Sequence, residues 1–285
     1  NQKLQTVTQK DNKSASMLDS LSSDYPMRIM VAEDNTVNQT LARIIFQRLG
    51  YEPDMAENGQ AAVELAALRN YDIIFMDVQM PIMDGIEATK TITSSLPTGK
   101  QPPVIVAMTA YAMDGDRDKC NEAGMIDYLS KPVTIDDIRR LLIKYGEQFN
   151  RQRSSTAPKT EATTSNTETI LFDDMELIDM AAIDRLKQLS DPQNQFMSKL
   201  VMLFMEQADG SIEEIKKHFA DGNAVLTSKA AHKLKGSAMN VGAARLSKLC
   251  ASIERSAINN ELGVAAQWVE SLENCNEASK SALAA

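Results

Sequence analysis

Short apolar runs alternate with helical patterns in the first half of the chain. Runs of consecutive apolar residues are typical of strands covered on both faces, and weaker runs also fit short strands. The expected strands are Arg28–Ala32, Glu52–Ala56, Ile73–Met76, Val104–Met108 and Met125–Leu129. The helical patterns cover Val37–Leu49, Ala61–Leu68, Gly85–Thr93, Asp114–Ala123 and Ile135–Tyr145. This alternation predicts an α/β fold with a doubly wound parallel sheet, in which ligands bind at the carboxyl ends of the strands.

The second half of the chain contains no strand candidate. Its apolar residues recur at helical spacing throughout, which predicts an all-α domain. The expected helical segments are Asp179–Leu189, Phe196–Phe204, Ser211–Phe219, Ala224–Met239, Leu246–Ile253 and Leu262–Leu272. A four-helix bundle with one or two short accessory helices is the economical arrangement of these segments.

Two polar segments divide the chain. Residues 1–26 are mostly polar and read as a flexible N-terminal tether, and residues 150–169 hold no aromatic and no aliphatic side chain larger than Ala. Such a segment cannot bury enough apolar surface to become ordered, and twenty flexible residues span about 25 Å. We therefore expect one domain over 27–149, a flexible linker over 150–169 and a second domain over 170–285.

The composition of the chain restricts the kinds of binding partner and the cellular compartment that we expect. Lys and Arg number 30 against 39 Asp and Glu, so the net charge of −9 argues against nucleic acid or an anionic membrane surface as a partner. Three cysteines without metal-ligand spacing indicate a reducing, cytoplasmic environment. The chain begins with Asn1 and not Met, so we expect a piece of a longer protein, with any inner-membrane anchor lying upstream.

Polar residues follow four of the five expected strands. Glu33 and Asp34 follow the first, Asp77 the third, Thr109 the fourth and Lys131 the fifth. Each has an ordinary explanation when taken alone: Asp34 or Asn35 could cap a helix and Asp77 a turn. Three carboxylates at one sheet edge would repel each other unless a divalent cation joined them, and oxygen ligands suit Mg²⁺. With a lysine and a hydroxyl nearby, the set indicates phosphoryl transfer.

The segments that carry these residues resemble the receiver domain of two-component response regulators, a flavodoxin-like (βα)5 fold. They are AEDNTVNQ (Ala32–Gln39), MDVQMPIMDG (Met76–Gly85), MTAYAM (Met108–Met113) and AGMIDYLSKP (Ala123–Pro132). The resemblance implies that Asp77 accepts the phosphoryl group. It also implies that Asp34 binds Mg²⁺ directly, Glu33 partly through water, and Gln79 through its backbone carbonyl.

The same resemblance gives roles to the residues after the last two strands. Thr109 and Lys131 would hold phosphoryl oxygens, and the Lys131–Pro132 bond is expected to be cis. Tyr128 occupies the position of the switch aromatic that is coupled to Thr109. The amino-acid sequence of these segments is similar to that of receivers attached to hybrid sensor histidine kinases.

The second half contains both histidines of the chain, and only His232 lies in a distinctive pattern. It is two residues from Ala230 and from Leu234 on the apolar helix face, so we expect it to face outward. The segment HKLKGSAMNVGA resembles the histidine-containing phosphotransfer (HPt) domain, a four-helix bundle with one phosphorylatable histidine. The resemblance makes His232 the phosphotransfer residue and assigns supporting positions to Lys235, Gly236 and Ser237. His218, in a charged stretch, reads as an ordinary surface histidine.

The two patterns together predict a phosphorelay segment from a hybrid sensor histidine kinase. The resemblance implies an upstream kinase domain, in the same parent chain, that phosphorylates Asp77, and a separate response regulator that receives the group from His232. No GxxxxGK[ST] loop or other nucleotide-binding pattern occurs, so the chain should not use ATP. Two alternatives remain open: a receiver-like interaction switch without durable phosphorylation, and a metal-dependent phosphohydrolase on the same sheet.

Overall fold

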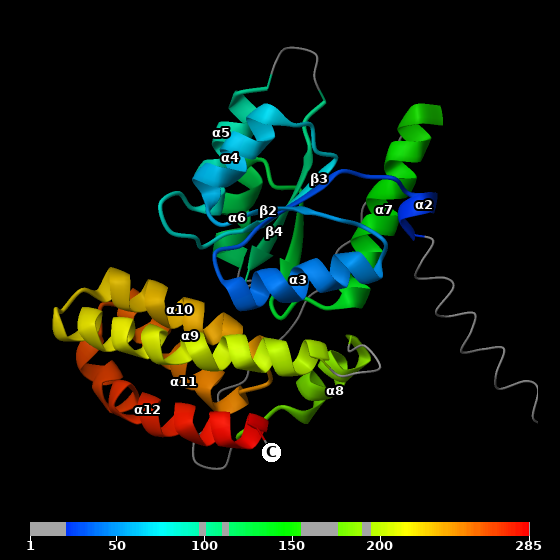
Figure 1. Cartoon of the computed structure of the whole chain (residues 1–285). Coiled ribbons are helices and arrows are strands. Elements are labelled where there is room, and N and C mark those ends of the chain that lie inside the picture. Colours follow the sequence, from blue (N-terminus) through cyan, green and yellow to red (C-terminus); the bar gives the residue numbers. More distant parts are fainter. Residues whose placement is uncertain (1–20, 97–100, 110–113, 155–175, 190–194, 285) are drawn as a thin grey trace, which may run out of the picture. The chain divides into compact units, whose positions relative to one another are not determined.

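The computed structural model describes residues 21–96, 101–109, 114–154, 176–189 and 195–284 (Figure 1). The chain separates into two compact units, one built on a sheet and one built on helices. The expected tether lies outside the described residues except at its end, and so does the expected linker from residue 155 onward. Within the described ranges, no helix combines the length and the apolar character needed to cross a membrane.

The first unit is built on a five-stranded sheet with strand order β2-β1-β3-β4-β5. Every neighbouring pair of strands is parallel. The strands are β1 (Ile29–Ala32), β2 (Asp54–Ala56), β3 (Ile73–Asp77), β4 (Val104–Thr109) and β5 (Asp127–Ser130). All residues of β1 and β3 are buried, as their unbroken apolar runs predict. The doubly wound α/β fold is confirmed.

Helices cover both faces of this sheet (Figure 1). They are α3 (Thr36–Arg48), α4 (Gly59–Leu68), α5 (Gly85–Ser94), α6 (Asp114–Ala123) and α7 (Ile135–Ser154). Side chains alternate between the two faces of a strand. Met30, Ile74 and Ile105 therefore face the core formed with α4, α5 and α6. On the opposite face, Phe75 packs against Phe46 of α3 with ring centroids 5.1 Å apart.

Two ends of this unit differ from the expected boundaries. A short helix, α2 (Leu21–Asp24), precedes the sheet, and α7 continues to Ser154, five residues beyond residue 149. The hydroxyl of Tyr51 lies 3.1 Å from the carbonyl oxygen of Leu21 and 2.7 Å from that of Tyr25. A Cβ on Gly146 of α7 would lie 2.5 Å from the ring of Tyr25, so the chain approaches α7 closely here. The last residues before β1 are thus packed on the domain.

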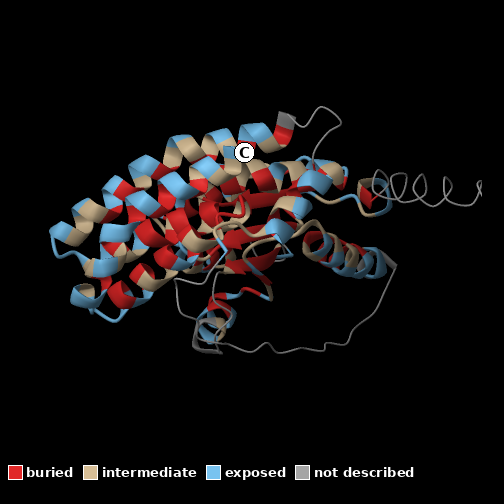
Figure 2. Ribbon diagram, turned by 90° about the horizontal axis from the view of Figure 1, so that it is seen from below, coloured by how far each residue is buried: buried red, intermediate tan, exposed pale blue. Residues whose placement is uncertain are grey.

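The second unit is a four-helix bundle with one accessory helix, as expected. The accessory helix is α8 (Met180–Leu189), and the bundle consists of α9 (Gln195–Ala220), α10 (Ala224–Asn240), α11 (Ala244–Ile258) and α12 (Leu262–Ala284). Consecutive bundle helices pack on each other and α12 returns to α9, which closes the bundle. The inner faces of these helices are buried and their outer faces exposed (Figure 2).

Two of the expected helical segments join into the single helix α9. The buried side chains of Phe204, Ala208 and Ile212 follow one another at intervals of four residues, so the apolar stripe runs unbroken through Asp209–Gly210. Gly210 lies on the exposed face, where a helix tolerates it at a cost of about 1 kcal/mol relative to Ala.

Candidate functional site

Three carboxylates meet at the carboxyl edge of the sheet. Glu33 and Asp34 directly follow β1, and Asp77 is the last residue of β3. Each can offer one oxygen such that all three oxygens lie within 4.8 Å of one another. Because β1 and β3 are neighbouring parallel strands, their carboxyl ends bring these residues together across more than forty positions of sequence. Hard oxygen ligands at this spacing can hold a divalent cation such as Mg²⁺.

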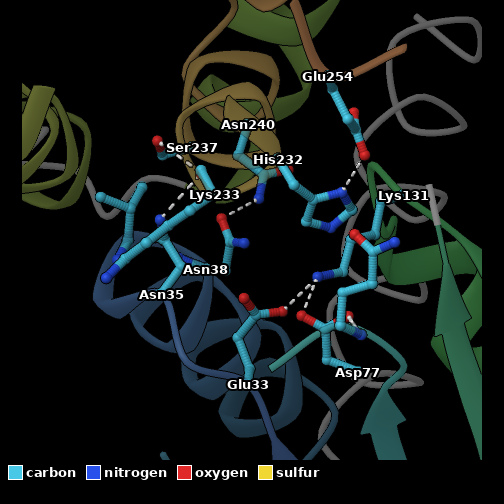
Figure 3. A network of polar contacts seen from close by, with 12 residues as sticks. Glu33, Asn35, Asn38, Asp77, Lys131, His232, Lys233, Ser237, Asn240 and Glu254 are labelled. Atoms are coloured by element: carbon cyan, nitrogen blue, oxygen red, sulfur yellow. Dashed lines mark hydrogen bonds and ion pairs between the residues drawn. The ribbon is translucent and has the colours of Figure 1, made fainter. Parts of the chain in front are cut away.

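Lys131 joins this acidic cluster from the loop after β5. Its Nζ lies 2.6 Å from an oxygen of Asp77 and 2.7 Å from one of Glu33 (Figure 3). Burial would lower the pKa of Lys131, but the charges of Asp77 and Glu33 outweigh that effect and its pKa lies above the ordinary value. One ammonium and three carboxylates leave a net charge of −2, which a divalent cation would balance. The peptide bond between Lys131 and Pro132 is cis.

The ordinary explanations of the strand-end residues are partly correct. Asn35 caps α3, because its Oδ1 accepts hydrogen bonds from the backbone N–H groups of Val37, at 2.9 Å, and Asn38, at 3.2 Å. Asp77 also accepts a bond of 3.2 Å from the backbone N–H of Gln79, so it orders the turn after β3 while its other oxygen contacts Lys131. A capping role therefore coexists with a place in the acidic cluster.

The loop after β3 is shaped by a glycine that the sequence analysis did not single out. A Cβ on Gly85 would lie 2.1 Å from the carbonyl oxygen of Asp77, and the N–H of Gly85 donates to the carbonyl of Val78 at 3.0 Å. Ile82, in the same loop, has a φ of 69°, a conformation that a β-branched residue rarely adopts. The unusual φ of Ile82 lies in the loop that follows Asp77, and strained backbone conformations cluster at functional sites.

Thr109 and Tyr128 lie on neighbouring strands. Thr109 ends β4, and its carbonyl accepts a hydrogen bond of 2.8 Å from the N–H of Lys131. The hydroxyl of Tyr128 donates to the carbonyl of Arg117 at 3.0 Å and also contacts Asn121, both in α6. Tyr128 is thus tied to α6, and its coupling to Thr109 stays a prediction.

In the second unit, His232 lies on α10. The expectation that it faces outward stays a prediction. Its Nδ1 lies 2.7 Å from Oε1 of Glu254 on α11 (Figure 3). The spacing from Ala230 and Leu234 places His232 away from the main apolar stripe of α10, and the contact with Glu254 connects it to α11.

Glu254 is the site residue that the sequence analysis missed. It is fully buried, and its second oxygen lies 2.6 Å from Nζ of Lys235. Burial would raise the pKa of Glu254, but the hydrogen bond and charge of His232, together with Lys235, outweigh it and lower the pKa. The available signal was a carboxylate within the apolar stripe of α11, next to Ile253 and four residues after Cys250.

Ser237 and Gly236 are the other two supporting positions that the resemblance assigned. Ser237 is buried, and its hydroxyl donates within its own helix to the carbonyl of Leu234 at 3.1 Å. Gly236 is half-buried on α10 and leaves that face without a side chain. His218 lies in the last turn of α9.

Comparisons with known proteins identify the family of each unit. The family model described as response regulator receiver domain matches residues 29–143, and the Hpt domain model matches residues 199–282. The signal transduction histidine-protein kinase BarA of Escherichia coli is 31% identical over 233 residues, covering 82% of this chain and 24% of BarA. The aerobic respiration control sensor protein ArcB of E. coli is 24% identical over 247 residues, covering 87% of this chain and 30% of ArcB.

A solved structure also resembles the first unit. The receiver domain of sensor histidine kinase PA1611 from Pseudomonas aeruginosa, with a magnesium ion in its active-site cleft, is 38% identical. The match covers 42% of this chain and 98% of that domain, with a TM-score of 0.39. This chain spans less than a third of the length of BarA or ArcB. From the two family models, residues 29–143 belong to the response regulator receiver family and residues 199–282 to the Hpt family, in a combination shared with hybrid histidine kinases.

Proposed function

We propose that this chain carries a phosphoryl group through two steps of a phosphorelay. Asp77 of the receiver accepts the group from a histidine of an upstream kinase, and His232 of the Hpt domain receives it from Asp77. A separate response regulator then takes it from His232. The observation that carries the proposal is the acidic cluster of Glu33, Asp34 and Asp77, with Lys131 bonded to Asp77 at 2.6 Å.

The receiver residues have the properties that the first step requires. An Asp77 oxygen attacks phosphorus while the P–N bond to the donor histidine breaks and the imidazole keeps the electron pair. Glu33, Asp34, Asp77 and the backbone carbonyl of Gln79 would hold Mg²⁺, which neutralises charge on the carboxylates and the phosphoryl oxygens. Lys131 already contacts Asp77 and provides a cation for the phosphoryl group.

The remaining strand-end residues complete the receiver site in this proposal. The hydroxyl of Thr109 donates to a phosphoryl oxygen, and Tyr128 follows its movement as a switch residue. In the bundle, Gly236 leaves room for a receiver surface to approach, while Lys235 and Ser237 support the helix that carries His232.

The relatives support the choice of partners in this proposal. The matched relatives are named histidine kinases, and the aligned region is less than a third of each. We therefore place the upstream kinase domain in the same parent chain and the receiving response regulator in another protein. The site as proposed requires no nucleic acid or membrane contact in this segment and works in the cytoplasm.

Phosphorylation with acetyl phosphate and Mg²⁺ tests the proposal on the wild type, D77A and H232A. Acyl phosphate is labile to alkali, whereas phosphohistidine is labile to acid and stable to alkali. We expect both in the wild type, neither in D77A, and acyl phosphate alone in H232A; chelation of Mg²⁺ should abolish all labelling.

The other results have distinct meanings. Labelling of Asp77 without His232 would contradict the relay order. Absence of labelling with a cognate kinase as well as with acetyl phosphate would favour an interaction switch. Multiple turnover on a small phosphomonoester that is lost in D77N would favour a phosphohydrolase.

A further inference from the structure

The loop that follows Asp77, residues 78–84, is held by hydrogen bonds from two glycines. At its start, the N–H of Gly85 donates to the carbonyl of Val78 at 3.0 Å. Near its end, the N–H of Gly59 donates to the carbonyl of Met83 at 3.0 Å. Gly59 is the first residue of α4 and belongs neither to the loop nor to the acidic cluster. Helix α4 therefore fixes the end of the loop that carries the phosphoryl site.

The contact between Gly59 and this loop leaves no room for a side chain. A Cβ on Gly59 would lie 2.4 Å from the carbonyl oxygen of Met83 and 3.0 Å from Cβ of Ala88 on α5. The first distance is well inside van der Waals contact, so either the loop or α4 would have to move. Helix α4 is anchored by the cap of Asn58, which accepts a backbone N–H at 2.8 Å, and by the buried Ala62. A shift of the loop is the easier response.

The same end of the loop has a strained backbone. The N–H of Met83 donates to the carbonyl of Pro81 at 2.8 Å, which closes a three-residue turn with Ile82 at its centre. The φ of Ile82 is 69°, and a turn of this kind at positive φ is rare, above all for a β-branched residue. The side chain of Ile82 is 82% exposed, so packing does little to hold it. Strained conformations persist where their surroundings enforce them, and the bond from Gly59 fixes the residue after Ile82.

Gln79 connects this turn to the phosphoryl site. Its N–H donates to Oδ1 of Asp77 at 3.2 Å, and in the proposed function its carbonyl binds Mg²⁺. We propose that Gly59 is a positioning residue, whose hydrogen bond and lack of a side chain keep the loop in the strained form that directs Gln79 toward Asp77 and the metal. The inference rests on the proposed phosphorelay function and adds to it a residue of α4.

The variant G59A disturbs this contact directly. The added methyl group displaces the carbonyl of Met83, and the turn at Ile82 relaxes. We expect the dissociation constant for Mg²⁺ to rise roughly 10-fold, the lower end of the range for changes to groups that orient a metal ligand. Asn tolerates positive φ, so I82N favours the turn without help from α4. The double variant G59A/I82N should therefore bind Mg²⁺ more tightly than G59A.

Isothermal titration calorimetry of the full chain with magnesium chloride measures this binding. The variant D77N gives the heat of Mg²⁺ binding elsewhere on the chain. The amide resonance of Gln79, followed by ¹⁵N NMR in EDTA, reports the loop without any metal. We expect it to shift in G59A and to return toward the wild-type position in G59A/I82N.

The matched control is G146A in α7. A Cβ on Gly146 would lie 2.5 Å from the ring of Tyr25, so this glycine is crowded as well. Tyr25 precedes β1, whereas Asp77 ends β3, so the control lies toward the opposite edge of the parallel sheet. We expect G146A to lower the denaturation midpoint in circular dichroism while the Mg²⁺ affinity and the Gln79 resonance stay as in the wild type.

Unchanged Mg²⁺ affinity in folded G59A would overturn the inference. An equal loss of affinity in G146A would do the same, because affinity would then follow stability in general. Failure of I82N to restore any affinity would contradict the role of the strained turn. A different result marks the proposed function: if the wild type binds no more Mg²⁺ than D77N, the metal site is wrong, whereas the resonance of Gln79 still decides whether Gly59 holds the loop.

Discussion

Removal of the Lys131 ammonium should destabilise the receiver strongly, and Mg²⁺ should reverse the effect. In the variant K131M, the net charge of the acidic cluster changes from −2 to −3. The side chains of Lys131, Glu33 and Asp77 are only 8%, 4% and 2% exposed. Water therefore screens poorly the negative charge that the carboxylates carry once the ammonium is removed. Loss of one partner from a buried ion pair costs about 3–5 kcal/mol, and we expect a loss near 3 kcal/mol because the carboxylates can take up a proton.

The rescue follows from charge balance. A divalent cation on Glu33, Asp34 and Asp77 supplies the positive charge that K131M lacks. Binding to the native state alone adds about 2.7 kcal/mol at a concentration one hundred times the dissociation constant. The difference in free energy of unfolding between EDTA and saturating Mg²⁺ should therefore be larger in K131M than in the wild type.

Chemical denaturation of the full chain provides the assay. Trp268 lies in α12, so its fluorescence reports the bundle, and loss of far-UV circular dichroism without a change in that fluorescence reports the receiver. The matched control is K144M: Lys144 also contacts a carboxylate at 2.7 Å, on Asp127, but is 54% exposed, so its loss should cost at most about 1 kcal/mol. Equal stability of K131M and wild type in EDTA would refute the electrostatic reasoning.

Three further predictions concern stability. Y51F removes the hydroxyl that holds the carbonyls before β1, so the receiver should lose about 1–2 kcal/mol in calorimetry, whereas no loss would mean that this segment does not stabilise the domain. Because the pKa of Glu254 is lowered on folding, its stabilisation is present above the ordinary value of 4.5 and is lost as pH falls below it. Bundle melts followed by Trp268 should show this decline in the wild type and less of it in E254Q; parallel profiles would contradict it. G210A should stabilise α9 by about 0.5–1 kcal/mol, since nothing lies within 4 Å of the added Cβ, and a lower melting temperature would refute this.

Local patterns of apolar and polar residues were sufficient to predict most of the fold. The unbroken apolar runs at β1, β3 and β4 predicted buried parallel strands, and the observed ends lie within one residue of those expected. Weak runs at β2 and β5 were placed less accurately at their starts, because short, partly buried strands carry less of the pattern. The segments 196–204 and 211–219 were expected as separate helices, yet α9 runs through both because packing of Phe204, Ala208 and Ile212 outweighs the low helix propensity of one glycine.

The acidic cluster was predictable because topology forces it. Parallel strands deliver their carboxyl ends to one edge, so residues after β1 and β3 must be neighbours whatever their separation in sequence. The surroundings of His232 were not predictable in this way. Helices α10 and α11 could meet at several rotations, and only their packing brings Glu254 to His232 and Lys235. The sequence alone determined the elements and the residues capable of chemistry. Tertiary packing decided which polar groups contact one another, because these pairings depend on contacts between faces that no local pattern specifies.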